Sequence, residues 1–326
     1  FCADDYRLNW SSPCLNNCGG AIGARAEWCD WWYVPGDFQT IRDAISHMTA
    51  TSPKNIILTA SLYESQTTDD ENQNLEIIWD DVTIRSQSGD PSSCRIVLSV
   101  PSAAHRFAWV TQGHSLELEG VTVEDGEYNE MGDPGGTVRV SGAATLRNCV
   151  ITNSDSNDGG AFAVDVGGRL KLVGCRIESC RSETGGAGAV YGALEADSTL
   201  FWANVGDNPF HAGAYAGGLY VTGRADIDQC TFVANTGGSR VRASAMYVDG
   251  EESEASIRRS IIAFGKPVIP AVGGCLSGGE VIASCTDVFG NGQNWAGCLN
   301  GQDAVDSLNN ITLEPGFCDT SAGDFH

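Results

Sequence analysis

One acidic stretch of the chain has side chains that could bind a divalent cation and support proton transfer. Residues 155–160 are Asp-Ser-Asn-Asp-Gly-Gly, a run rich in the oxygen ligands that Ca²⁺ prefers. Carboxylates that hold Ca²⁺ next to an arginine base provide the chemistry of a lyase acting on an acidic polysaccharide. The groups that could serve are Asp155, Asp158 and Asp165, with Arg169 or Arg181 as the base. We therefore predict Asp155 and Asp158 as candidate calcium ligands, with ordinary Asx-Gly turns as the alternative interpretation.

Sequence patterns of other catalytic sites are missing. The chain has no Gly-His-Gly stretch, no GxSxG and no HExxH, and His47, His105 and His211 each stand alone. A strongly acidic groove would also repel an anionic polysaccharide unless cations intervene. We name no catalytic residue, and we keep a polysaccharide lyase or hydrolase as the alternative to a non-enzymatic role.

The elements that would position these groups follow from a repeat in the middle of the chain. An aliphatic residue is followed three positions later by a small residue or a cysteine, and two positions after that by an apolar residue. Successive small positions lie 24 to 31 residues apart. The aliphatic positions are Leu118, Leu146, Leu172, Ile227 and Ile257, and the small positions are Val121, Cys149, Cys175, Thr199, Cys230 and Ser260, with Cys285 as a looser seventh.

A second pattern precedes each copy of the first and keeps the same period. It ends on Val140, Val164, Val190, Val221 and Val248. Alternating apolar residues indicate short strands with one buried face, and glycines before them indicate tight turns. No helical stripe separates the strands, which excludes a βαβ sheet. We predict an all-β fold, a right-handed parallel β-helix with coils of 24–31 residues, in which equivalent residues stack into buried ladders.

The first coil is expected to begin with a short helix over about residues 37–48. Asp37 is the expected N-cap. The apolar side chains that share one helical face are Phe38, Ile41, Ala44 and Ile45. Such a helix could lie over the open end of a β-helix and seal it.

Cysteine spacing divides the chain into a short N-terminal segment and a long β-helix. Residues 1–33 have little periodicity and are too few to fold unaided, so we expect disulfides to crosslink them. The cysteines available there are Cys2, Cys14, Cys18 and Cys29. The β-helix is expected over residues 34–326 and ends in a cysteine-containing tail, residues 275–326.

The other cysteines of interest lie in the repeat and in the tail. Cys149, Cys175 and Cys230 are expected in the buried ladder; the spacing of Cys149 and Cys175 also permits a disulfide, but buried thiols are favoured. In the tail, Cys298 and Cys318 fit one disulfide and Cys275 and Cys285 could form another, while the sequence leaves the connectivity open. The total of 13 cysteines favours an oxidising compartment, and the odd number leaves at least one without a partner in the same chain.

Composition and charge narrow the range of partners. The chain has 42 acidic and 19 basic residues, a formal net charge of -23, which argues against binding nucleic acid. No apolar run is long enough for a membrane-spanning helix, so no span is expected. The sequence begins at Phe1 and shows no signal peptide, which we interpret as a mature secreted protein, extracellular or at the cell surface.

Several motifs resemble those of secreted bacterial right-handed β-helix repeat proteins. Residues 38–45 resemble the start of the first coil in that group. Cys285-Thr-Asp-Val-Phe-Gly-Asn, Trp295-Ala-Gly-Cys and Glu314-Pro-Gly-Phe-Cys resemble its last coils. The resemblance covers about residues 34–326; it implies the β-helix fold and assigns no reaction.

A weaker resemblance points to the chlamydial polymorphic membrane proteins, a family of surface adhesins. Gly160-Ala161 and Gly186-Ala187 are similar to the GGA motif of that family. Phe201-Trp-Ala-Asn204 and Phe232-Val-Ala-Asn235 are similar to its FxxN motif.

We expect an extracellular structural or adhesive protein, and we keep two alternatives. The C-terminal end, Gly323-Asp-Phe-His326, shows no obvious polar cap, and an open edge favours head-to-tail assembly of copies into filaments. An exposed row of aromatic residues would instead favour a carbohydrate-binding adhesin, and three carboxylates beside an arginine would favour the lyase. The expected partners are other copies of the chain or a surface polysaccharide, and no cofactor is expected apart from Ca²⁺ at the candidate site.

Overall fold

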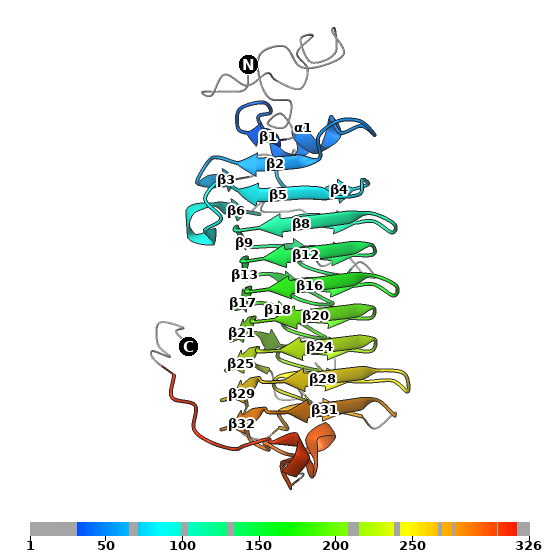
Figure 1. Cartoon of the computed structure of the whole chain (residues 1–326), viewed down its shortest axis with the longest axis vertical. Helices are drawn as coiled ribbons and strands as arrows, with labels where there is room; N and C mark the ends of the chain where they lie inside the picture. Colours follow the sequence, from blue (N-terminus) through cyan, green and yellow to red (C-terminus); the bar gives the residue numbers. More distant parts are fainter. Residues whose placement is uncertain are drawn as a thin grey trace.

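The chain forms a parallel β-helix, in which short strands stack coil upon coil along one axis (Figure 1). The computed structural model describes residues 31–64, 71–98, 104–128, 134–207, 215–237, 242–266, 269–275, 278–304 and 306–317. All strand pairs within its sheets are parallel, and each strand pairs with the equivalent strand of the next coil, as the repeat predicts. The right-handed sense of the coils stays a prediction from the sequence.

Within the described residues the strands form four sheets. Sheet 1 has ten strands: β1 (Trp31–Val34), β2 (Asn55–Leu58), β5 (Val82–Ser86), β8 (Ser115–Glu119), β12 (Ala143–Arg147), β16 (Arg169–Val173), β20 (Ala193–Asp197), β24 (Arg224–Asp228), β28 (Glu254–Arg258) and β31 (Glu280–Ser284). Sheet 2 has nine: β3 (Leu62–Glu64), β6 (Arg95–Val97), β9 (Thr122–Glu124), β13 (Val150–Thr152), β17 (Arg176–Glu178), β21 (Leu200–Trp202), β25 (Thr231–Val233), β29 (Ile261–Ala263) and β32 (Asp287–Phe289).

The other two sheets complete each coil. Sheet 3 has eight described strands: β4 (Leu75–Ile77), β7 (Ala108–Val110), β11 (Val138–Val140), β15 (Phe162–Val164), β19 (Gly188–Val190), β23 (Leu219–Val221), β27 (Met246–Val248) and β30 (Val272–Gly274). Sheet 4 has five described two-residue strands: β10 (Glu127–Tyr128), β14 (Asp155–Ser156), β18 (Arg181–Ser182), β22 (Val205–Gly206) and β26 (Thr236–Gly237).

The aliphatic ladder lies on the inner face of sheet 1. Its members are fully buried, and they pair in register from coil to coil, with Ala196 between Leu172 and Ile227. The aliphatic residues of this ladder are Leu118, Leu146, Leu172, Ile227 and Ile257. Alternation explains the arrangement, because every second side chain of a strand points to the same face of its sheet.

A tight turn joins sheet 1 to sheet 2 in each coil and contains the ladder of small residues. Its first residue has a φ between +48° and +64° in seven successive coils, and the next residue is buried. Those buried residues are Val121, Cys149, Cys175, Thr199, Cys230, Ser260 and Thr286. The assignment of Cys285 to this ladder is therefore wrong by one position. Ser284 pairs with Arg258, so Thr286 takes the buried position and Cys285 lies exposed at the turn.

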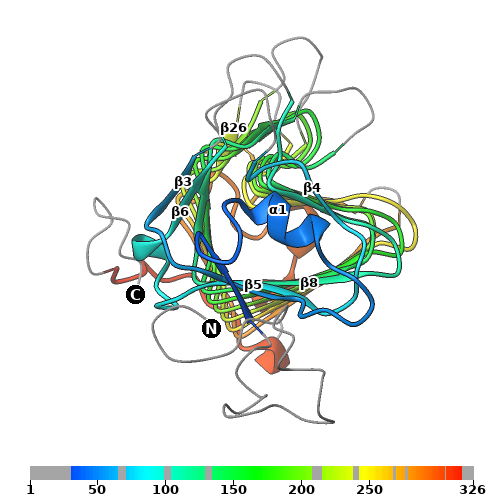
Figure 2. The same ribbon diagram turned by 90° about the horizontal axis from the view of Figure 1, so that it is seen from above.

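The N-terminal end of the β-helix is covered by α1 (Ile41–Ser46), which lies over the centre of the coils in Figure 2. The helix is shorter than predicted and its N-cap is Thr40, whose side chain accepts a hydrogen bond from the amide of Asp43. Asp37 is not the cap, because its carboxylate accepts from the amide of Tyr33 in a preceding turn. The first strand, β1, crosses the boundary expected between residues 33 and 34, while residues 1–30, with Cys2, Cys14, Cys18 and Cys29, lie outside the described residues.

Part of the C-terminal edge of the β-helix is covered as well, while Gly323-Asp-Phe-His326, the end expected to lack a polar cap, lies outside the described residues. Three short 3₁₀ helices, Gly297–Leu299, Gln302–Ala304 and Asp306–Leu308, follow the last coil. The Gln302 side chain accepts from the amide of Ala283 (2.8 Å) and donates to the carbonyl of Val281 (2.7 Å). These bonds occupy groups that an open strand would offer to another chain.

A disulfide between Cys275 and Cys298 holds this covering segment to the last coils. Both cysteine pairings considered for the tail are therefore wrong: Cys275 does not pair with Cys285, which is free, and Cys298 is not available to Cys318. Sequence spacing could not select the partner, because the side chains meet only after the covering segment folds back on the coils. Cys318 lies outside the described residues.

Candidate functional site

The predicted calcium ligands Asp155 and Asp158 interact with different partners. The Asp158 carboxylate accepts from the hydroxyls of Thr184 (2.6 Å) and Tyr191 (2.5 Å). Asp155 lies on β14 beside Arg181 of the next coil; burial raises the pKa of Asp155, and Arg181 partly opposes that rise. Within the part of the chain that the structure describes, no group of three or more His, Cys, Asp or Glu side chains could hold a metal ion.

Two of the other groups considered for lyase chemistry, Asp165 and Arg181, also have partners. Asp165 accepts from Arg139 Nε (2.9 Å) and from the hydroxyl of Ser141 (2.5 Å). Arg181 forms an ion pair with Asp207 at 2.6 Å. Arg169 lies exposed at the start of β16 in sheet 1. Asp158, Asp165 and Arg181 are therefore each engaged by a different set of side chains.

The outer face of sheet 3 carries a row of aromatic side chains, which we call the aromatic strip. The middle residue of each sheet-3 strand points outward, because its two neighbours point to the core. In register these outward residues are Trp109, Arg139, Ala163, Ala189, Tyr220 and Tyr247. Tyr191, directly after β19, and Tyr215, just before β23, complete the strip.

The four tyrosine rings form one continuous surface. Tyr220 contacts Tyr191, with ring centroids 6.1 Å apart in an edge arrangement, and Tyr215 at 4.7 Å. Tyr247 lies at 6.3 Å from Tyr220, with the planes nearly parallel at 15°. Tyr247 is buried, whereas the other three rings are half-buried, so Tyr247 supports the rings that solvent reaches. Such pairs favour one fixed arrangement of the rings.

Polar groups border the tyrosine rings. Arg242 donates from a guanidinium nitrogen to the Tyr247 hydroxyl (3.1 Å), and its guanidinium lies 5.0 Å from the Tyr215 ring centroid. Burial, and after it nearby carboxylates, raise the pKa of Tyr191 and Tyr220 above the usual range of a phenol. Both hydroxyls stay protonated at neutral pH, and the Tyr191 hydroxyl donates its hydrogen to Asp158.

The opposite end of the aromatic strip is formed by Trp109. Its indole nitrogen donates to the Ser141 hydroxyl (2.9 Å), and the Arg139 guanidinium lies 5.1 Å from its ring centroid. Between Trp109 and Tyr220, Ala163 and Ala189 are fully buried.

A fixed row of aromatic faces with hydrogen-bonding groups along its edges suits a flat, hydroxyl-rich ligand. The apolar face of a sugar ring can stack on an aromatic ring, while its hydroxyls bond to the polar border. Sequence reasoning missed this surface. The sequence signal for this surface was present in Gly217-Gly-Leu-Tyr-Val and Ala245-Met-Tyr-Val. In each, tyrosine is the middle residue of a three-residue strand and points outward between two residues that point to the core.

Comparisons with known proteins do not assign the chain to a family: no family model, no curated protein and no solved structure matches it. The resemblances to bacterial and chlamydial proteins therefore gain no support beyond the β-helix fold that they imply. Among the described residues, none of the helices has the length and apolar character needed to cross a membrane.

Proposed function

We propose that this chain is a non-catalytic carbohydrate-binding β-helix protein that works outside the cell, and that the aromatic strip is its binding surface. The observation that carries the proposal is the run of contacting rings Tyr191, Tyr215, Tyr220 and Tyr247 on the outer face of sheet 3. The Cys275–Cys298 disulfide supports an oxidising compartment, since such bonds are rare in the cytosol.

The charge of the chain favours a neutral polysaccharide as the ligand. The net charge of -23 repels anionic glycans over the whole surface. Two of the carboxylates near the strip are paired or hydrogen-bonded, Asp165 with Arg139 and Asp158 with Tyr191. Hydroxyl and aromatic contacts therefore dominate what the strip offers, and they suit an uncharged sugar chain.

Because the strip runs along the axis of the coils, it favours a polymeric ligand over a single sugar. Equivalent positions recur at every coil, about 4.8 Å apart along the axis. Tyr191, Tyr220 and Tyr247 come from three successive coils, so a polysaccharide that runs along the axis can meet aromatic rings from more than one coil. Assembly of copies by strand addition receives less support, because the covering segment already bonds to the C-terminal edge through Gln302.

The test is co-sedimentation of the whole chain with insoluble polysaccharides, and affinity electrophoresis with soluble ones. Cellulose, chitin and mannan represent neutral chains, and pectate and alginate represent anionic ones. We expect retention by at least one neutral chain. Retention by none, or release of unsaturated sugar ends from an anionic chain, would overturn the proposal.

A further inference from the structure

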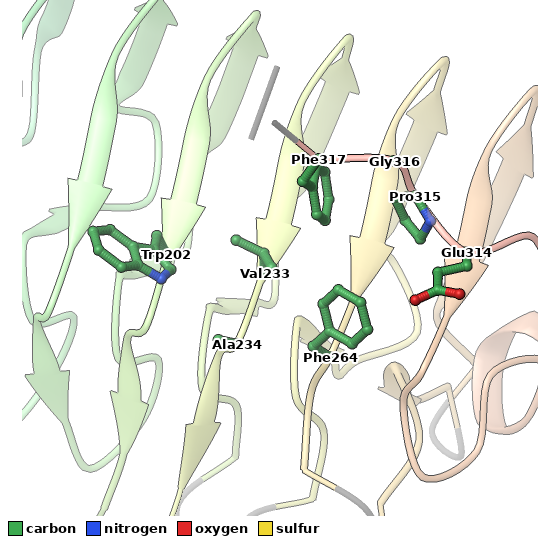
Figure 3. A pocket seen from close by; sticks show the side chains of 8 residues that line it. All are labelled: Trp202, Val233, Ala234, Phe264, Glu314, Pro315, Gly316 and Phe317. Atoms are coloured by element: carbon green, nitrogen blue, oxygen red, sulfur yellow. The ribbon is translucent and has the colours of Figure 1, made fainter. Parts of the chain in front are cut away.

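A groove lies on the outer face of sheet 2, on a different side of the coils from the aromatic strip. It has a volume of about 710 Å³ and is open to solvent. Its lining residues are Trp202, Val233, Ala234 and Phe264 from the coils, and Glu314, Pro315, Gly316 and Phe317 from the tail (Figure 3). A volume of this size fits a small organic molecule.

The groove exists because one coil lacks a large outward side chain. Trp202 on β21 and Phe264 after β29 belong to coils two apart. The coil between them presents only Val233 and Ala234. Two coil spacings are about 9.6 Å. A cation in the gap over Val233 and Ala234 would have one aromatic ring on either side, and a ring attracts a cation within about 6 Å of its centroid.

The tail forms the remaining wall and is held in place by several contacts. The amide of Leu313 donates to the Asp287 carboxylate (3.0 Å), and the Trp295 indole donates to the Thr312 hydroxyl (2.6 Å). The Phe317 ring then lies 6.2 Å from the Phe264 ring in an edge arrangement. Figure 3 shows Phe317 near Val233, Pro315 farther along the tail toward Glu314, and Trp202 on the opposite side of Val233 from Phe264.

The charges around the groove favour a positive guest. Glu314 is the one charged side chain among the described residues that line it. Trp202 already interacts with one cation, since the Arg176 guanidinium lies 4.7 Å from its ring centroid. Arg176 does not line the groove, and its charge is balanced by Glu178 at 2.5 Å.

We propose that this groove binds a quaternary ammonium group, as in choline, between Trp202, Phe264 and Phe317, with Glu314 as the counter-ion. Aromatic faces attract a methylated ammonium through the negative charge of their π electrons, and such a cation costs little to remove from water. The overall negative charge of the chain adds a favourable field. This site does not depend on carbohydrate binding at the aromatic strip.

Isothermal titration of the whole chain with choline tests the proposal. The matched control is the neutral isostere of choline, in which a tert-butyl group replaces the trimethylammonium group. We expect choline to bind at least tenfold tighter, because only choline gains from charge. Equal binding of the two compounds, or binding of neither choline nor phosphatidylcholine vesicles, would overturn the proposal. Binding to the vesicles alone assigns the group to a lipid headgroup, and binding to choline alone assigns it to a free metabolite.

Two variants test the aromatic ring and the carboxylate of the proposed site separately. Trp202→Ala and Glu314→Gln are each expected to weaken choline binding about tenfold. Glu314→Gln changes an exposed residue of the tail, so it tests the site even where Trp202→Ala disturbs the coil. Trp109→Ala, which removes an exposed tryptophan from sheet 3, serves as the control and is expected to leave choline binding unchanged. Unchanged binding in Glu314→Gln and Trp202→Ala together would contradict the assignment.

Discussion

The side-chain amide of Asn204 donates from Nδ2 to Oδ1 of Asn235, 3.0 Å away on the next coil. Both residues are buried in the turn that follows sheet 2, and Asn235 in turn donates to the carbonyl of Phe201 (2.8 Å). The aromatic members of the same motifs, Phe201 and Phe232, stack in the core with centroids 4.4 Å apart. The repeated Phe-x-x-Asn pattern is thus explained by packing and by hydrogen bonding inside the fold.

Replacing Asn204 with alanine is expected to destabilise the chain by about 3 kcal/mol. The side chain also accepts from the amide of Cys180 (3.0 Å) and donates to the carbonyl of Ile177 (2.9 Å), so its loss leaves buried polar groups without partners. Urea denaturation measures the change. The control is Asn153→Gly at an exposed turn residue with φ +56°, where glycine should change stability by less than about 0.5 kcal/mol. Equal losses in both variants would contradict the role of Asn204.

The buried thiols predict a loss of stability at alkaline pH. Burial raises the pKa of Cys180 and Cys230 to about 12 and that of Cys94 to about 11, well above the usual range of a thiol. Above about pH 9 the unfolded chain loses these protons while the folded chain keeps them. The stability that each thiol contributes is complete below pH 9 and falls by up to about 1.4 kcal/mol per pH unit as the pH rises through the folded pKa.

Cys230→Ser isolates one of these contributions. The same turn position holds Thr199 and Ser260 on the adjacent coils, so a hydroxyl fits there and can donate to the carbonyl of Ala196, as the thiol does. We expect a change of less than about 1 kcal/mol at pH 7 and a shallower fall in stability between about pH 9 and pH 12. Melting temperatures recorded across that pH range measure how steeply the stability falls. A slope identical to that of the unmodified chain would show that Cys230 already ionises in the folded state.

Exposure predicts which of the described thiols react. Cys285 lies exposed at a turn, whereas Cys94, Cys149, Cys175, Cys180 and Cys230 are buried. A brief treatment of the folded chain with iodoacetamide, followed by peptide mass spectrometry, should modify Cys285 and leave these five unmodified until denaturant is added. Rapid modification of Cys149 or Cys175 would contradict the stacking of the turn ladder.

The fold could be predicted from the sequence because a β-helix repeats its packing in every coil. Leu118, Leu146 and Leu172 recur at the coil period for one physical reason, burial on sheet 1, and that reason is visible as spacing. Features that occur once in the fold gave no such signal. The partner of Cys275, the cap at Thr40 and the covering contacts of Gln302 depend on how non-repeating segments fold back. The aromatic strip could not be predicted for another reason. A tyrosine such as Tyr220 at one outward position is common on protein surfaces, and it indicates a binding surface only when the neighbouring rings are known.

The Cys275–Cys298 disulfide is expected to stabilise the covering segment locally. It links residues 23 apart in sequence and lies beside Leu299, which is fully buried. Changing both cysteines to alanine should cost about 3 kcal/mol in the opening free energy of this segment. Hydrogen exchange at the amide of Ala283, which bonds to Gln302, measures that opening. Cys285→Ala is the control and should leave the exchange rate unchanged, while equal exchange in the double variant would mean that the segment holds without the disulfide.

The aromatic strip can be tested with one ring at a time. Tyr220 touches Tyr191, Tyr215 and Tyr247, so Tyr220→Ala removes the centre of the strip and should weaken binding of a retained neutral polysaccharide about tenfold. Tyr191→Phe keeps the ring but loses the hydrogen bond to Asp158, and should weaken binding less. Affinity electrophoresis measures both. Phe264→Ala removes an exposed ring from the other side of the coils and should leave retention unchanged, because that ring borders the sheet-2 groove. If Phe264→Ala lost retention and Tyr220→Ala did not, the carbohydrate-binding surface would have to be assigned to sheet 2 and not to sheet 3.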